Sequence, residues 1–136
     1  MAAFSIFSAC NQKSAIASSS PGDKPLEQTT WKLVALTSLA GSFPQLPKDV
    51  TMRMQDGRIN GFAGCNTYFG GYTSKLNYVQ FTGVGSTRMF CQQGMDVENG
   101  LFQVFTNTSN YRISGSHLEL MKSDAVLAKF EALSGK

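Results

Sequence analysis

The stretch Gly61–Tyr72, GFAGCNTYFGGY, places one cysteine and one asparagine among four glycines and four aromatic residues. Glycines allow the backbone to bend sharply, and aromatic side chains supply large apolar surfaces for a core. The stretch also contains Cys65, which could be a nucleophile, a metal ligand, half of a disulfide or a buried apolar side chain. Each alternative predicts a different kind of protein and needs different companion residues elsewhere in the chain.

Short alternating segments flank this stretch and are separated by turn signals, at the spacing typical of a small β sandwich or barrel. The dipeptide Asp56-Gly57 lies between two of them and predicts a tight hairpin, because glycine tolerates the positive φ that such turns require. The stretch Gly61–Tyr72 thus begins as the second arm of a hairpin and runs on into another strand. The predicted strands are Thr30–Leu36, Val50–Met54, Arg58–Gly64, Tyr68–Tyr72, Lys75–Gly85, Tyr111–Ser114, His117–Met121 and Ala125–Leu133.

One segment, Gly94–Asn107, has a different period. Its apolar residues Val97, Leu101 and Val104 recur at steps of three and four, which predicts an amphipathic helix. Carboxylates in its first turn suit the positive end of the helix dipole. The predicted fold class is therefore mainly β with one inserted helix, in a small curved antiparallel sheet or partly closed barrel of about seven to eight strands.

Composition and charge narrow the functional classes. The 136 residues are enough for one domain and a tail, and 42% of them are hydrophobic. The formal charge is +3, but the basic residues are scattered, and no basic patch typical of a nucleic-acid interface is visible in the sequence. No apolar run approaches the roughly 18 to 20 residues that span a bilayer as a helix. We expect a monomer with no nucleic-acid partner.

The N-terminal residues differ in composition from the rest. Residues 1–9, MAAFSIFSA, are small and apolar, and they precede Cys10 and a spacer rich in Ser and Ala. An apolar stretch that ends in small residues before a cysteine resembles the lipobox of a bacterial lipoprotein, in which that cysteine is lipidated. Phe7 replaces the usual leucine of this motif, and no basic residue precedes Cys10.

These features predict three parts of the chain. Residues 1–9 are a signal-peptide remnant, residues 10–29 are a lipidation site and flexible tether, and residues 30–136 are the folded domain. The predicted anchor is a lipid on Cys10, which would attach the protein to a membrane. The alternative is a disordered tail with an incidental thiol.

A metal site or a catalytic thiol at Cys65 would need companion residues. The chain has three cysteines and one histidine, and Cys65, Cys91 and His117 show none of the paired spacing of a zinc site. A nucleophilic thiol needs a base to hold it as a thiolate, and His117 lies at a predicted junction of turn and strand. No phosphate-binding loop, dinucleotide-binding glycine pattern or serine nucleophile motif is present. We expect no catalytic residues, no metal and no cofactor.

Two alternatives for Cys65 remain open. If Cys10 carries a lipid, Cys65 and Cys91 are an even pair in an exported protein, as expected for a disulfide. The bridge would close a loop of about 27 residues and contribute about 3 to 4 kcal/mol to stability. The other alternative is two buried, reduced thiols that pack as small apolar groups.

Several motifs occur in a specific order. GFAGCNTYFGGY follows TWKLVAL, and after a strand come STRMFC (Ser86–Cys91), an acidic helix start with Glu98 and, near the end, LEL. This order resembles the META domain of the HslJ heat-shock lipoprotein family, and the similarity covers Thr30 to about Leu133. The residues at the family's motif positions are Cys65, Asn66, Thr87, Arg88, Met89, Cys91 and Glu98.

The resemblance implies a small, mainly β envelope protein with a lipid anchor. The family is associated with heat shock and novobiocin resistance, which are phenotypes, and it provides no catalytic residues to transfer. The motif residues are therefore signature residues and not a predicted active site.

The residue types at these positions indicate structural roles. Asn66 lies in a glycine-rich bend, where asparagine tolerates left-handed backbone and can bond neighbouring amides. Arg88 could pair with Glu98 at the helix start, in a partly exposed ion pair worth about 1 kcal/mol or less, or it could be an ordinary solvated side chain. The aromatic residues expected in the core are Phe62, Tyr68, Phe69, Tyr72, Tyr78 and Phe81.

Two functions are consistent with these expectations. The first is a non-enzymatic cell-envelope lipoprotein, in the outer membrane facing the periplasm, that binds an unknown envelope protein and acts in stress response or tolerance of novobiocin-type antibiotics. Asn11 rather than Asp after Cys10 favours the outer membrane by the sorting habit of the family. The alternative is a periplasmic barrel that binds a small molecule or lipid. A barrel interior filled by its own side chains would argue against that alternative.

Overall fold

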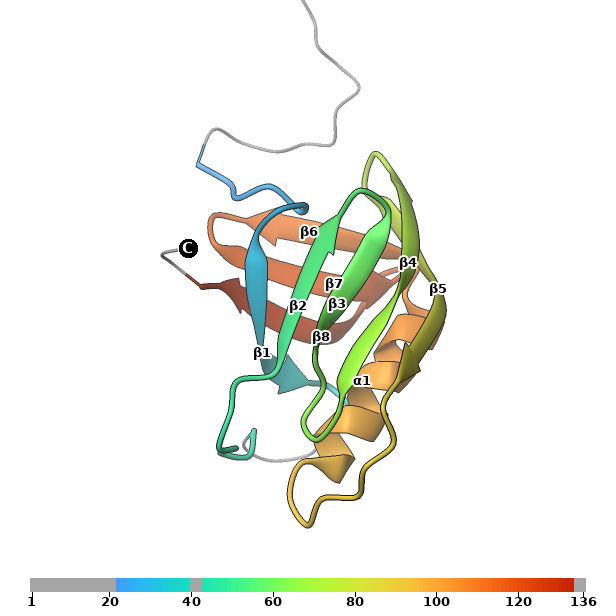
Figure 1. Ribbon diagram of the computed structural model, residues 1–136. Helices are drawn as coiled ribbons and strands as arrows, with labels where there is room; N and C mark the ends of the chain where they lie inside the picture. The colour runs from blue at the N-terminus through green and yellow to red at the C-terminus, as the bar shows by residue number, and fades with distance from the viewer. Residues whose placement is uncertain (1–21, 40–42, 134–136) are drawn as a thin grey trace, which may run out of the picture.

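The computed structural model describes residues 22–39 and 43–133, which fold into eight β-strands and one α-helix (Figure 1). The predicted lipidation site Cys10 and most of the predicted tether lie outside the described residues. The strands are β1 (Thr30–Leu36), β2 (Thr51–Gln55), β3 (Arg58–Phe62), β4 (Thr67–Lys75), β5 (Tyr78–Ser86), β6 (Asn110–Ser114), β7 (His117–Lys122) and β8 (Ala125–Ala132), and the helix is α1 (Met95–Asn107).

The eight strands form one antiparallel sheet that closes on itself. Each strand from β1 to β7 pairs with the next strand in sequence, and β1 also pairs with β8, so the order around the ring is the order along the chain. The β1–β8 ladder places Leu33 opposite Phe130, whereas β5 and β6 meet at a single register pair, Tyr78 with Asn110. The predicted fold class, mainly β with one inserted helix, is confirmed, and the helix follows the fifth strand.

Side chains fill the interior of this ring. Successive residues of a strand point to opposite faces, so alternate positions of each strand face inward. Trp31 is fully buried, and its indole Nε1 donates a hydrogen bond to the carbonyl of Leu26 at 3.0 Å. The ring therefore encloses a packed core. The largest fully buried side chains are Trp31, Tyr68, Phe130, Leu33, Met52, Met54, Ile59, Leu101, Leu118, Leu120, Val79 and Val97.

Helix α1 covers one end of the ring, at the place where β5 diverges from β6 (Figure 1). Its apolar face packs inward, and the ring of Phe105 lies 4.8 Å from that of Phe81 and 5.2 Å from that of Tyr68. In the part of the chain that the structure describes, no helix has the length and apolarity needed to cross a membrane.

Residues 23–29, the N-terminal strap, cover the opposite end (Figure 1). Leu26 of the strap is buried in the core, and its carbonyl accepts the hydrogen bond from Trp31. The hydroxyl of Tyr72 donates a hydrogen bond to the carboxylate of Glu27. Burial and this bond raise the pKa of Tyr72 to about 12. Strap and helix together close both ends of the ring.

The predicted strand Lys75–Gly85 is wrong at its start. Leu76 and Asn77 form a two-residue turn between β4 and β5, in which Leu76 has a φ of 55°. Leucine gives no sequence signal for such a turn, which favours glycine or asparagine at a positive φ.

Two of the six aromatic residues expected in the core are exposed. Phe69 and Tyr78 retain 56% and 61% of their accessible surface, because each lies on the outer face of its strand. Tyr68 and Phe81, each on the opposite face of one of these strands, are buried as predicted.

The left-handed backbone at Leu76 makes a testable prediction. Replacing Leu76 by glycine should raise the free energy of unfolding by about 0.5 to 1 kcal/mol, because a side chain at this φ is strained and half of it lies in solvent. Urea denaturation would measure the change. As a control, Thr73→Gly in the same hairpin should lower stability by about 1 kcal/mol. Equal losses of stability in the two variants would contradict backbone strain at Leu76.

Candidate functional site

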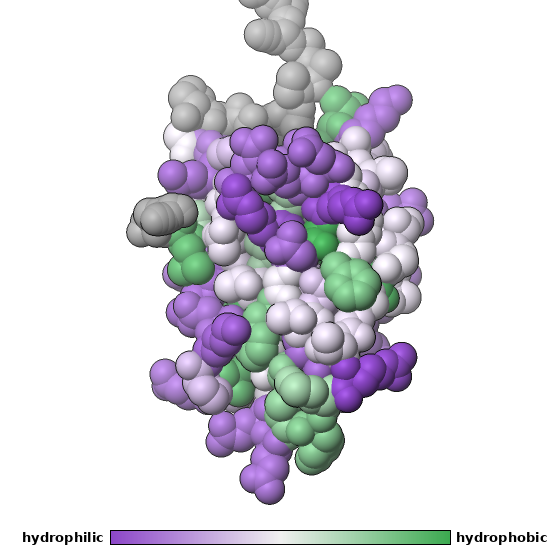
Figure 2. Space-filling view, in the orientation of Figure 1, coloured by the Kyte–Doolittle hydropathy of each residue, from purple (hydrophilic) through white to green (hydrophobic). Residues whose placement is uncertain are grey.

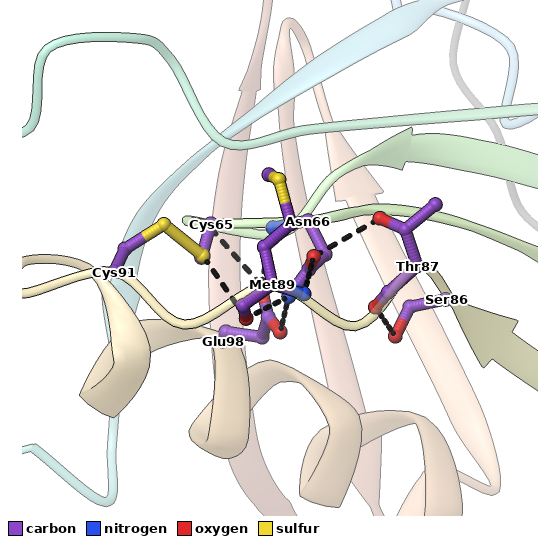
Figure 3. Close-up of a disulfide and its surroundings, with 7 residues drawn as sticks. All are labelled: Cys65, Asn66, Ser86, Thr87, Met89, Cys91 and Glu98. Atoms are coloured by element: carbon purple, nitrogen blue, oxygen red, sulfur yellow. Dashed lines mark hydrogen bonds between the residues drawn. A yellow bond between two sulfur atoms is a disulfide. The ribbon is translucent and has the colours of Figure 1, made fainter.

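Apart from Arg88, the signature residues come from three separate segments and meet at the helix-covered end of the ring (Figure 3). Cys65 and Asn66 lie in the connection between β3 and β4. Thr87, Met89 and Cys91 lie in the connection between β5 and α1, and Glu98 lies in the first turn of the helix. The chain folds this way because β3–β4 and β4–β5 are hairpins, which bring both connections to the same end of the sheet.

Cys65 and Cys91 form a disulfide (Figure 3). The predicted pairing is therefore confirmed, and the alternative of two reduced thiols is wrong. The bridge joins residues 26 positions apart and ties the β3–β4 connection to the segment before the helix. On the chain-entropy model, it contributes about 3 to 4 kcal/mol to stability.

The carboxamide of Asn66 is buried and uses all of its hydrogen-bonding capacity. Its oxygen accepts from the backbone N–H of Met89 at 2.7 Å and from the hydroxyl of Thr87 at 3.0 Å. Its nitrogen donates to the carbonyl of Met89 at 3.1 Å and to the carboxylate of Glu98 at 2.7 Å. One side chain thus pairs with both backbone groups of Met89, as a neighbouring strand would.

The carboxylate of Glu98 is also buried, with 4% of the residue exposed. It accepts from the backbone N–H groups of Cys65 at 3.0 Å and Asn66 at 2.7 Å, in addition to the side chain of Asn66. Three N–H donors and its position in the first helical turn replace the hydration that burial removes. We call Cys65, Asn66, Thr87, Met89 and Glu98 the signature network.

Of the two alternatives for Arg88, the solvated side chain is confirmed and the ion pair is wrong, and the left-handed backbone expected near Asn66 lies elsewhere. Arg88 is exposed and makes no ion pair with Glu98 in the described part of the chain, because that carboxylate faces the backbone amides of the β3–β4 connection. Asn66 does not have a left-handed backbone. Instead, the positive φ of this bend falls on Gly64, at 129°.

Two glycines that the sequence reasoning did not single out complete the network. Gly64 and Gly94 face each other, and a Cβ atom built on Gly94 would lie 2.3 Å from the carbonyl oxygen of Gly64. Gly94 also has a φ of 94° at the start of the helix. Only glycine fits both constraints. Their separation of 30 positions gave no signal in the sequence.

The network offers little reactive chemistry. Cys65 and Cys91 are oxidised, Asn66 is fully engaged, and the oxygens of Glu98 point at amides. Within residues 22–39 and 43–133, no cluster of three or more His, Cys, Asp or Glu residues could hold a metal ion. The arrangement fixes the positions of three segments relative to one another.

Next to the buried polar groups of the network lies a solvent-exposed apolar surface, to which the side chain of Met89 also belongs. Phe90 and Met89 retain 82% and 59% of their accessible surface. Figure 2 shows apolar side chains gathered at the lower end of the visible face, where the connections after β3 and β5 lie in Figure 1. A groove of about 460 Å³ runs beside them, between the end of β5 and α1. Its walls include Val84, Ser86, Arg88, Met89, Phe90, Met95 and Phe102.

Comparison with protein families places this fold and network in context. The model of a family described as the META domain matches residues 24–134. An NMR structure of a protein from Burkholderia xenovorans is similar with a TM-score of 0.67 and 21% identity, covering 93% of this chain and 100% of the other. A second NMR structure is similar with a TM-score of 0.62 and 15% identity, covering 78% of this chain and 90% of the other. These two likenesses concern the fold alone. The comparison with curated proteins gave no match.

The buried carboxylate predicts a large effect of a small substitution. Glu98→Gln should lower the free energy of unfolding by about 1.5 to 3 kcal/mol, because the amide puts a donor where the carboxylate accepted an N–H. Asp96→Asn, an exposed acid in the same helical turn, should cost less than about 1 kcal/mol. Chemical denaturation would compare them, and equal costs would refute the importance of the network.

The facing glycines give a second comparison. Gly94→Ala should lower the free energy of unfolding by more than about 3 kcal/mol, because the new methyl group meets backbone atoms and the φ is positive. Gly83→Ala should cost only about 1 kcal/mol, since its φ is also positive, at 60°, but nothing lies within 4 Å of the added Cβ. Thermal unfolding of both variants would separate the clash with the backbone of Gly64 from the cost of the positive φ. Similar losses of stability in the two variants would rule out the clash.

Proposed function

This chain belongs to the META domain family, and on that premise we propose that it is a non-enzymatic lipoprotein of the cell envelope that acts by binding a partner. In this proposal, a lipid on Cys10 anchors the domain to the outer membrane on the periplasmic side. The domain contributes to the envelope stress response or to tolerance of novobiocin-type antibiotics. Its partner is an envelope protein.

The observation that carries the proposal is the state of the signature residues. Asn66 and Glu98 are buried, and their polar atoms are engaged within the domain. Such groups stabilise a shape and are poorly placed to attack or protonate a substrate. A family signature built in this way supports a binding role over a catalytic one.

The exposed side chains next to the network supply a surface for binding. An apolar side chain such as Phe90, of which 82% is exposed, gains free energy when a partner covers it. The N-terminal strap covers the end of the ring opposite the β5–α1 connection, which carries Phe90 (Figure 1). A membrane anchor at Cys10 would therefore attach at one end of the domain and leave Phe90 at the other.

The alternative, a barrel that encloses a lipid or a small molecule, is disfavoured by the packed interior. Trp31, Tyr68 and Phe130 occupy the middle of the ring with at most 1% exposure. The N-terminal strap and α1 close its two ends. A ligand inside the ring would have to displace core side chains, at a cost of several kcal/mol.

The anchoring part of the proposal predicts the site of lipid attachment. In cells that make the full chain behind an added export signal, radiolabelled palmitate should enter the wild-type protein and be absent from Cys10→Ser. Lys13→Ala, three residues further on, should be labelled as wild type. Label that persists in Cys10→Ser, or no label in any variant, would overturn the anchor.

A phenotype tests the binding part separately. If the domain acts through the β5–α1 connection, Phe90→Ser should raise novobiocin sensitivity in the host as much as deletion of the gene does. The lipid label and the amount of protein should stay unchanged. Tyr78→Ser, which removes a largely exposed ring from the far end of β5, should leave sensitivity at the wild-type level.

A further inference from the structure

We propose that the segment Ser86–Phe90, the edge segment, binds an extended stretch of a partner protein by strand addition. The occupant is a partner strand that carries apolar residues and at least one carboxylate. This inference rests on the proposed binding role and names the chemistry of the partner. Backbone geometry, the groove and the exposed side chains support it independently.

The backbone of the edge segment has one engaged side and one open side. Thr87 donates its N–H to the carbonyl of Thr67, and Met89 pairs both backbone groups with the side chain of Asn66. In extended backbone, the N–H and C=O groups of successive residues point to opposite sides. β5 ends at Ser86, but the contacts of Thr87 and Met89 continue its alternation. By this alternation the backbone groups of Ser86 and Arg88 point away from β4, and the structure gives them no backbone partner within the described residues.

The other end of β5 alternates with the opposite parity, because the β4–β5 register shifts between Phe69 and Gly71. Val79 donates its N–H to the carbonyl of Ser109 on the side facing β6. Beyond Val79 that side of β5 loses its neighbour, because β5 and β6 share only the register pair of Tyr78 with Asn110. The sheet is thus closed along most of its length but leaves the end of β5 as an edge, the kind of edge to which extended peptides add.

The groove gives an added strand a place to lie. It runs along the edge segment, and residues Met95 and Phe102 of α1 line its other side. An extended segment there would have β5 on one side for hydrogen bonds and apolar helix side chains on the other. The edge segment itself is held in position by the Cys65–Cys91 disulfide and by Asn66, so little conformational entropy remains to be lost on binding.

The side chains around the edge define the chemistry of the occupant. Phe90 and Met89 offer apolar contacts, and Arg88 is an exposed cation that makes no ion pair with any described residue. A segment that alternates apolar residues with carboxylates would meet both features. A lipid tail fits less well, because hydrocarbon cannot satisfy the open backbone groups of Ser86 and Arg88.

The test uses the full chain with Cys10→Ser, so that neither lipidation nor a membrane is needed. The probe is a fluorescein-labelled octapeptide of alternating Val and Glu, and its matched control carries N-methyl groups on the four central residues. Fluorescence anisotropy should show at least tenfold weaker binding of the N-methylated peptide, because it cannot form the ladder. NMR should show shifted, slowly exchanging amides at Ser86 and Arg88 when the first peptide binds.

Variants separate the contributions of the apolar side chain of Phe90 and the charge of Arg88 to peptide binding. Phe90→Ser should weaken peptide binding about tenfold, and Arg88→Gln about two- to fivefold, with a smaller effect in high salt. Tyr78→Ser, at the other end of the same strand, should bind within about twofold of the parent. An octapeptide of alternating Val and Lys should bind more weakly than the Val–Glu peptide, because it repels Arg88.

Three results would overturn the inference. The first is equal binding of the peptide with and without N-methyl groups. The second is amide shifts that map away from Ser86 and Arg88. The third is binding to vesicles of phosphatidylethanolamine and phosphatidylglycerol that depends on Phe90, with no binding of either peptide. None of these depends on palmitate labelling of Cys10, so the inference and the anchor can fail separately.

Discussion

The buried carboxylate of Glu98 is the contact on which the helix-covered end of the domain depends. A charge in an apolar environment is tolerated only when donors surround it, and here the backbone amides of Cys65 and Asn66 supply them. Those amides face the carboxylate because Gly64 turns the chain with a φ of 129°. Gly94, which has no side chain, allows the start of the helix to lie close to Gly64. The disulfide and the carboxamide of Asn66 then attach the segment after β5 to the same point.

Much of this architecture could be predicted from residue patterns. The period of two in the strands and of three to four in α1 follows directly from burial on one face, so the eight strands and the helix were found with small errors at their ends. Cysteine arithmetic made the disulfide one of two open alternatives, on the condition that Cys10 carries a lipid. Leu76 marks the limit of this reasoning, because its positive φ is imposed by the short connection between two strands and not by its own preference.

The network could be predicted only in part. Its members can be recognised as signature residues. Their hydrogen-bond partners cannot, because these depend on how the β3–β4 and β4–β5 hairpins bring separate connections together. Arg88 is the natural sequence partner for Glu98, being ten positions away with opposite charge, yet amides from a different connection take its place. The exposure of Phe69 could not be read locally either, because both faces of β4 carry aromatic residues.

The single register pair between β5 and β6 has a consequence for motion. A ring of strands can open only where a ladder breaks, and every other ladder has at least three register pairs to lose. Local opening of the domain should therefore begin between β5 and β6. Helix α1 would then either remain packed on β5 or detach from it. Local opening there would leave the N-terminal strap and the long β1–β8 ladder intact, so one side of the domain could fluctuate while the other remained rigid.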